Sequence, residues 1–225
     1  MSHLALKRSV VRECKICDSS ARTIQDKRRD IIYFRCESCG FIALDEVHLI
    51  DAKSERQHYE KHENSLACDG YVRMFEEFIK IAILPYRTKS DTVLDFGCGH
   101  TPVLAELLKR HGFSVDIYDI YFYPEKIYRD KEYSMIVSTE VFEHLKNPIE
   151  IFQELVDSLK IGGYLILMTQ FPHKTDEEFL EWWYRRDVTH ISFFTPHSFE
   201  IMAKRVGLNL IKTMNDNIVV FQKPC

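Results

Sequence analysis

Four cysteines near the start of the chain have a spacing that could bind a metal ion. They form two Cys-x-x-Cys pairs separated by 18 residues, and their positions are Cys14, Cys17, Cys36 and Cys39. Two such pairs are typical of a zinc ribbon, in which each pair lies on a tight turn and tetrahedral zinc joins the turns. The alternatives are disulfides, which are rare in the cytoplasm, or unrelated free cysteines. Four protein ligands leave no open position, so we expect a structural zinc ion.

A second candidate site is the segment Leu94-Asp95-Phe96-Gly97-Cys98-Gly99. Val93 and Leu94 are typical of a buried strand, and the glycines allow a sharp turn and the close approach of a ligand. Thr101 and Pro102 predict a helix start with Thr101 as the N-cap. Strand, turn and helix together indicate a nucleotide-binding unit. Because Pro102 stands where a dinucleotide fingerprint has its third glycine, the pattern argues against a dehydrogenase.

An acidic residue follows the next predicted strand, which spans residues 113–118. Asp119 lies at the carboxyl end of that strand, 20 positions after Gly99. An acid at this place can accept hydrogen bonds from both ribose hydroxyls of a nucleotide. The alternatives are that Asp119 only caps a turn, or that Asp116 takes this role.

Three segments, in this order along the chain, resemble motifs of the class I S-adenosylmethionine-dependent methyltransferases. They are Leu94–Gly99, the run Glu-Val-Phe-Glu-His at 140–144, and the run Leu-Lys-Ile-Gly-Gly at 159–163. One departure is His100-Thr101, where many members have a further glycine. The resemblance covers residues 91–225. It implies a Rossmann-like, doubly wound α/β sheet, mostly parallel with an antiparallel C-terminal strand, and S-adenosylmethionine as cofactor. The cofactor-binding residues that it implies are Asp95, Gly97, Cys98, Gly99, Asp119, Ile120, Thr139 and Glu140.

Two further segments are expected to cover the strand ends where the cofactor binds. Residues 59–65 and 179–190 resemble segments of a subset of bacterial zinc-ribbon methyltransferases whose substrates are uncharacterised. From the first segment we expect contacts with the cofactor by Tyr59, His62 and Asn64. From the second we expect contacts with the methyl acceptor by Trp183, Arg185, Arg186 and Asp187. The alternative is that the tryptophans belong to the core and the arginines pair with Asp187 or Glu181.

Two histidines are candidate catalytic bases. Methyl transfer depends mainly on positioning, and a base helps only where the nucleophile carries a proton. Histidine titrates near neutral pH, which makes His190 and His144 the candidates. His190 is preferred, because His144 could simply brace the end of a strand.

Composition sets the broader expectations. The chain has 225 residues and a net charge of −4, but residues 1–40 hold nine basic and five acidic residues. We expect a zinc ribbon at 1–45, a helical linker or cap at 46–90 and a methyltransferase core at 91–225. No apolar run is long enough to span a bilayer, and the N-terminus lacks the features of a signal peptide, so we expect no membrane association and a cytoplasmic protein.

These features together predict a zinc-containing, S-adenosylmethionine-dependent methyltransferase. We expect a small-molecule acceptor, because the acidic body lacks the basic stripe that extensive nucleic-acid contact needs. Methylation of ribosomal or transfer RNA is the first alternative, since some ribosomal RNA methyltransferases also carry a zinc-binding N-terminal module. A non-catalytic zinc-ribbon binding protein with a methyltransferase-like body is the second.

Overall fold

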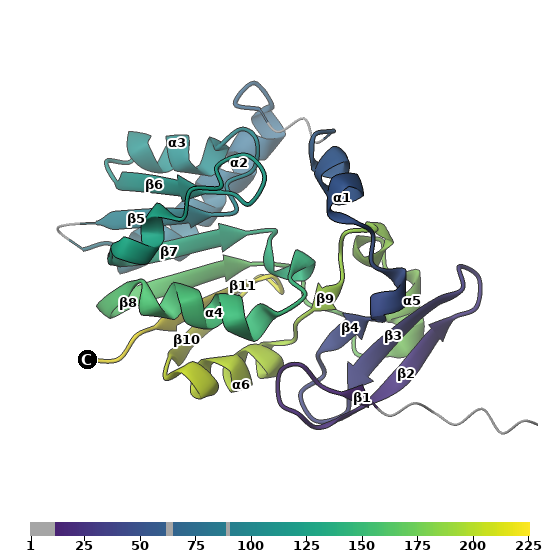
Figure 1. The fold of residues 1–225 in the computed structure, drawn as a ribbon. Helices are drawn as coiled ribbons and strands as arrows, with labels where there is room; N and C mark the ends of the chain where they lie inside the picture. The colour runs from purple at the N-terminus through teal and green to yellow at the C-terminus, as the bar shows by residue number, and fades with distance from the viewer. Residues whose placement is uncertain (1–11, 62–64, 89–90) are drawn as a thin grey trace, which may run out of the picture.

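A six-stranded sheet lies at the centre of the computed structural model, which describes residues 12–61, 65–88 and 91–225 (Figure 1). Its strand order is β10-β11-β8-β7-β5-β6. The four parallel strands are β5 (Thr92–Phe96), β6 (Ser114–Tyr118), β7 (Tyr133–Thr139) and β8 (Leu159–Met168). The two antiparallel strands are β10 (Asn209–Met214) and β11 (Ile218–Gln222). The predicted Rossmann-like sheet, mostly parallel with an antiparallel end, is confirmed.

Helices cover both faces of this sheet, as Figure 1 shows. One face carries α2 (Asp69–Phe78), which continues into a π-helical turn (Ile79–Ile83) and a 3-10 turn (Leu84–Tyr86), and α3 (Val103–Arg110). The other face carries α4 (Pro148–Asp157) and α6 (Pro196–Val206). Because parallel strands between two helical layers are buried on both sides, Val93 and Leu94 are fully buried.

Two helices begin in different ways. Helix α6 begins after Thr195, whose hydroxyl accepts a hydrogen bond from the Ser198 backbone, and it ends at Gly207 in the left-handed conformation. Helix α3 begins after Pro102 with no side-chain cap. The prediction of Thr101 as its N-cap is therefore wrong: the Thr101 hydroxyl lies 3.3 Å from Nδ1 of His100 instead.

The cysteine-rich N-terminal part forms a second, antiparallel sheet that includes one strand from the body. Its order is β1-β2-β3-β4-β9, with strands β1 (Arg12–Glu13), β2 (Ser20–Asp26), β3 (Ile31–Cys36), β4 (Ile42–Leu44) and β9 (Ser192–Phe193). Tyr33, Phe179 and Phe193 pack edge to face beneath it. Strand β9 belongs to the body, since it comes more than 20 residues after β8, and it pairs with β4. The N-terminal sheet is thus continuous with the body.

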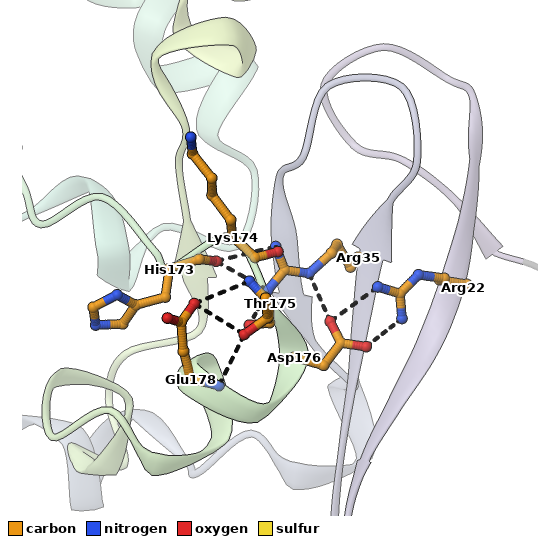
Figure 2. A network of polar contacts seen from close by, with 7 residues as sticks. All are labelled: Arg22, Arg35, His173, Lys174, Thr175, Asp176 and Glu178. Atoms are coloured by element: carbon orange, nitrogen blue, oxygen red, sulfur yellow. Dashed lines mark hydrogen bonds and ion pairs between the residues drawn. The ribbon is translucent and has the colours of Figure 1, made fainter.

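A polar network also ties the N-terminal sheet to the body (Figure 2). Arg35 on β3 is buried and donates to the backbone carbonyls of His173, Lys174 and Thr175. Its Nε lies 3.0 Å from a carboxylate oxygen of Asp176, and Arg22 on β2 pairs with both oxygens of the same carboxylate. Asp176 begins α5 (Asp176–Glu181), so the network fixes this helix against the N-terminal sheet.

Helix α1 (Ala52–Tyr59) runs from the N-terminal sheet toward α2 (Figure 1). The remaining helical elements are 3-10 turns at Glu46–His48, Ile127–Asp130, Phe142–His144 and Tyr184–Arg186. Within the described ranges, none of the helices combines the length and the apolar character that a membrane crossing requires.

Candidate functional site

A cavity of about 830 Å³ lies at the carboxyl ends of β5, β6 and β7. In open parallel sheets, ligands bind in the crevice outside these strand ends. Five carboxylates and two lysines are among the lining residues: Glu55, Asp95, Asp119, Glu140, Glu150, Lys126 and Lys146. The cavity size is within the range of roughly 300–1,000 Å³ that is usual for small-molecule sites.

The turn after β5 forms one wall of the cavity, and Gly97 is required there by its surroundings. Gly97 has a φ of +82°, and a Cβ added to it would lie 2.2 Å from Cγ2 of Val141. Its backbone N–H donates to the carbonyl of Tyr118 across a distance of 2.7 Å. A side chain at position 97 would therefore push apart the turn and the segment after β7.

Asp119 joins this turn to the segment after β6. One carboxylate oxygen accepts a hydrogen bond from the Gly99 backbone at 3.1 Å. The other accepts from the backbones of Tyr121 and Phe122 at 2.9 and 3.1 Å. Asp119 therefore caps a turn and lines the cavity as well. The rival Asp116 accepts hydrogen bonds from Lys131 and Tyr133 and is not a lining residue.

Asp95 is a buried carboxyl group at the end of β5. Burial raises the pKa of Asp95 to about 7, because the charged form loses its hydration. Its Oδ2 has no hydrogen-bond partner among the residues that the structure describes. An acceptor without a partner is costly in a protein interior, and here it belongs to a residue that lines the cavity.

Most of the residues expected at the cofactor line this cavity. They are Tyr59, Asp95, Gly97, Cys98, Gly99, Asp119, Ile120, Thr139 and Glu140. His62 and Asn64 lie outside the described residues. Burial raises the pKa of the Cys98 thiol, which keeps it protonated at neutral pH and fits its interpretation as a small residue in the turn.

The two candidate bases, His144 and His190, also line the cavity. Their rings meet edge to face with centroids 4.8 Å apart. Nδ1 of His144 donates to the carbonyl of Thr189 at 3.0 Å, and Nδ1 of His190 donates to the carbonyl of Tyr184 at 2.7 Å. Burial lowers the pKa of His190 to about 3. A base with that pKa takes up a proton only under acidic conditions, so His190 is neutral at pH 7.

Two carboxyl groups lie beside these histidines. The Tyr184 hydroxyl lies 2.9 Å from Oε2 of Glu140 and 2.5 Å from Oε1 of Glu143. Burial, together with the charge of Glu143, raises the pKa of Glu140 to about 9. Burial also raises the pKa of Glu143, which is fully inaccessible to solvent. Glu143 and Tyr184 were not predicted as site residues, although Glu143 belongs to the motif at 140–144.

The residues expected at the acceptor are not brought to the cavity. Trp183 is 66% exposed, and Arg186 is exposed and donates to the Glu181 carbonyl. Arg185 is buried in an ion pair with Asp26 of the N-terminal sheet, at 2.5 Å. Asp187 accepts hydrogen bonds from Thr189 and contacts His58. None of the four is a lining residue; this aromatic and basic segment instead helps to hold the N-terminal sheet against the body.

The four cysteines predicted as metal ligands come together in the N-terminal sheet, outside the cavity lining. Their sulfur atoms all lie within 4.8 Å of one another. Sγ of Cys14 is 3.6 Å from that of Cys39, and Sγ of Cys17 is 3.4 Å from that of Cys36. The contact with Cys39 lowers the pKa of Cys14 to about 5.

Ile191, the residue before β9, connects the N-terminal sheet to the turn that holds Glu143 and His144. The Leu44 backbone N–H donates to the carbonyl of Ile191 at 2.8 Å, and the Ile191 N–H donates to the carbonyl of Glu143 at 2.8 Å. Sequence reasoning missed this link, and it also missed Glu55, Tyr71, Phe75 and Tyr121 in the cavity lining. Helix α1 supplies Glu55, which accepts hydrogen bonds from the hydroxyls of Tyr59 and Tyr121.

Comparisons with known proteins identify the family and the fold. The family model described as a methyltransferase domain matches residues 59–213. Three solved structures have a similar fold. A SAM-dependent methyltransferase from Archaeoglobus fulgidus is 15% identical, with 75% of this chain and 99% of that chain covered and a TM-score of 0.53. An O-methyltransferase family protein from Burkholderia thailandensis is 12% identical, with 76% and 68% covered and a TM-score of 0.51.

The third structure is magnesium protoporphyrin IX methyltransferase from Synechocystis PCC 6803, with 11% identity, coverage of 77% and 92%, and a TM-score of 0.50. At these identities the likeness shows the fold alone. No curated protein matches the sequence at a significant level. Because the family model spans more than half of the chain, the chain belongs to this methyltransferase family, and the expected enzyme class, a SAM-dependent methyltransferase, is confirmed.

Proposed function

We propose that the cavity at the carboxyl ends of β5, β6 and β7 binds S-adenosylmethionine and that the methyl group passes to a small-molecule acceptor in the same cavity. The observation that carries this proposal is the joining of Gly97, Gly99 and Asp119 in one cavity wall, through the hydrogen bond from Gly99 to Asp119. The bound cofactor would supply an activated methyl group, and the protein would supply position.

The residues of this wall fit the donor chemically. Each carboxylate oxygen of Asp119 already accepts backbone hydrogen bonds, but a carboxylate has about four lone-pair sites. Three of them are used by Gly99, Tyr121 and Phe122, and the one that remains, on Oδ2, can accept a ribose hydroxyl. The absence of side chains at positions 97 and 99 leaves backbone available to the methionine end of the cofactor. Asp95, whose Oδ2 has no partner, is close enough to this turn to line the same wall.

The form and charge of the cavity favour a small acceptor over a nucleic acid. Glu55 and Tyr59 of α1 help to line it, so a helix from outside the core contributes to its wall. Carboxylates outnumber lysines among the lining residues, whereas phosphate groups attract basic surfaces. We place the acceptor on the side of the cavity that holds His144 and His190, whereas the glycine turn holds the donor.

We also propose that Cys14, Cys17, Cys36 and Cys39 bind a structural zinc ion. For tetrahedral zinc with Zn–S bonds of about 2.3 Å, the sulfur atoms are separated by roughly 3.8 Å. The observed pairs at 3.4 and 3.6 Å are close to that value and far longer than a disulfide bond. Backbone N–H groups of Ile16 and Cys39 point to Sγ of Cys14 and Cys36 at 3.4 Å, which stabilises thiolates.

Calorimetric titration with S-adenosylhomocysteine tests the donor site, with two aspartate variants as a matched pair. Asp119→Asn removes a charged acceptor and should weaken binding by about tenfold or more. Asp116→Asn changes a carboxylate on β6, three positions before Asp119, that does not line the cavity, so it should bind like the wild type. Equal binding by all three proteins would contradict the proposed place of the ribose.

Transfer of a labelled methyl group tests the acceptor class. Incubation of the enzyme with labelled S-adenosylmethionine and either a small-molecule extract or total RNA should label the small-molecule fraction. Label found in RNA alone, with binding that weakens as salt increases, would contradict the small-molecule proposal and leave the donor site intact.

A further inference from the structure

A cluster of Glu143, His144 and His190 has the composition of a metal-binding site that is separate from the four cysteines. Each of the three residues offers one ligand atom, and these atoms all lie within 4.8 Å of one another. Nε2 of His144 lies 3.9 Å from Oε1 of Glu143. The ligands come from two segments, the 3-10 turn after β7 and the segment before β9, so the fold brings them together.

Both imidazole rings are oriented by the backbone. A carbonyl oxygen can only accept a hydrogen bond, so Nδ1 of His144 carries the proton donated to Thr189, and Nδ1 of His190 carries the proton donated to Tyr184. In each neutral ring, Nε2 then holds a lone pair. A hydrogen bond from the second ring nitrogen to a carbonyl is the usual way in which proteins orient metal-binding histidines.

The two carboxyl groups at the cluster, Glu140 and Glu143, share a single hydroxyl donor. Glu140 and Glu143 share the hydroxyl of Tyr184, but that hydroxyl has one proton and can donate fully to only one of them. In the described parts of the chain, neither carboxylate forms an ion pair with a lysine or an arginine. Oε2 of Glu143 is buried, and no described residue forms a hydrogen bond with it. Buried carboxylates normally have a charged partner or coordinate a metal.

The backbone at Glu140 supports a specific role for this carboxylate. Its φ is +53°, in the left-handed region that side-chain-bearing residues rarely adopt. Such strain costs of order 1 kcal/mol or more and is concentrated at functional sites. The Glu140 backbone N–H donates to the carbonyl of Met168 at 2.8 Å, which holds the residue in this conformation.

We propose that Glu143, His144 and His190 bind one divalent first-row transition-metal ion, with Glu140 as a fourth ligand. Two imidazoles with carboxylates suit Mn²⁺, Fe²⁺ or Zn²⁺ better than Mg²⁺ or Ca²⁺, which prefer oxygen ligands alone. Glu140, His144 and His190 line the cavity, so the ion would face it. A cation there would stabilise a deprotonated hydroxyl. In this respect the inference rests on the proposed function and favours an acceptor that is methylated on oxygen.

Titration with MnCl₂, followed by the electron paramagnetic resonance signal of free Mn²⁺, tests the site directly. Mn²⁺ is a suitable probe because thiolates prefer softer ions, so it should leave the cysteine site undisturbed. We expect the wild type to bind one Mn²⁺ per chain. Glu143→Gln, which keeps the size of the side chain, and His190→Ala should each weaken binding at least tenfold. His197→Ala is the control, because His197 is exposed on α6 and pairs with Glu200.

Direct binding in the wild type keeps the test decisive even where a variant folds poorly. The proposal would be overturned if the wild type bound neither Mn²⁺ nor a second equivalent of Zn²⁺, or if both variants bound Mn²⁺ as the wild type does. Binding of S-adenosylhomocysteine, measured on the same samples, separates the two proposals. Metal binding without cofactor binding would contradict the donor site, whereas cofactor binding without metal binding would contradict only the metal site.

Discussion

Substitution of Gly97 by alanine tests the geometry of the turn after β5. A Cβ at this position would lie 2.2 Å from Cγ2 and 3.2 Å from Cγ1 of Val141. Relief of this overlap should cost about 1–3 kcal/mol, as for other overpacked sites. The φ of +82° adds roughly 1–2 kcal/mol for any residue with a Cβ. The free energy of unfolding should therefore fall by about 2–5 kcal/mol, a large part of a typical total.

Three further variants separate these contributions. Gly99 has a φ of +70°, and an added Cβ would meet no atom within 4 Å. Gly99→Ala should therefore cost only the backbone contribution, roughly 1–2 kcal/mol. Val141→Ala removes the two methyl groups that Gly97→Ala would strike. Combined with Gly97→Ala, it should make the double variant about 1–3 kcal/mol more stable than the sum of the single effects.

Urea denaturation monitored by circular dichroism measures the free energy of unfolding of the wild type and of all four variants. Additive effects of Gly97→Ala and Val141→Ala, within about 0.5 kcal/mol, would refute the proposed contact. Equal losses for Gly97→Ala and Gly99→Ala would refute it as well. Either result would mean that the segment after β7 is not packed against the turn as described.

Three further predictions concern the ribbon and the buried acids. Asp26→Asn should lower the free energy of unfolding by about 3–5 kcal/mol, because it leaves the buried charge of Arg185 without its partner. Glu181→Gln, in an exposed pair with Arg28, should lower it by no more than about 1 kcal/mol. Equal losses in urea denaturation would contradict this contrast. Removal of zinc by a chelator should unfold the N-terminal sheet. An unchanged circular dichroism spectrum after zinc loss, verified by metal analysis, would contradict the structural role of zinc. The pKa of Asp95 is raised from 3.8 to about 7 by folding. Between these pH values the folded state holds a proton that the unfolded state has lost, so the free energy of unfolding should fall as pH rises from 3.8 to 7. Asp95→Asn should flatten this fall, and an unchanged pH profile would show that Asp95 does not contribute.

The parts of the fold that the sequence predicts well are set by local patterns. Alternating apolar runs and helices predict the parallel sheet, and Thr195 with Gly207 predicts both ends of α6. The turn from Asp95 to Gly99 is recognisable because glycine spacing and the flanking strand lie within a few residues. Even here, the prediction of Thr101 as the N-cap of α3 is wrong, because Pro102 takes the N-cap position with a non-helical ψ of 68°.

The parts that it predicts poorly depend on contacts between distant segments. Trp183, Arg185 and Arg186 lie in a run rich in aromatic and basic residues, and composition alone does not distinguish a ligand site from an internal interface. Arg185 meets Asp26, a partner 159 positions away, and this partner decides its role. Nothing local marks Tyr184 as the hydroxyl between Glu140 and Glu143, since that contact exists only after β7 and the segment before β9 have packed together.

A crystal structure of the protein with S-adenosylhomocysteine bound is the most direct test of the account. It should show a ribose hydroxyl at the carboxylate of Asp119, the methionine end against the turn at Gly97 and Gly99, and the sulfur facing the side of the cavity that holds His144 and His190. A ligand bound elsewhere, or a cavity that stays empty at saturating ligand concentration, would contradict the proposed donor site.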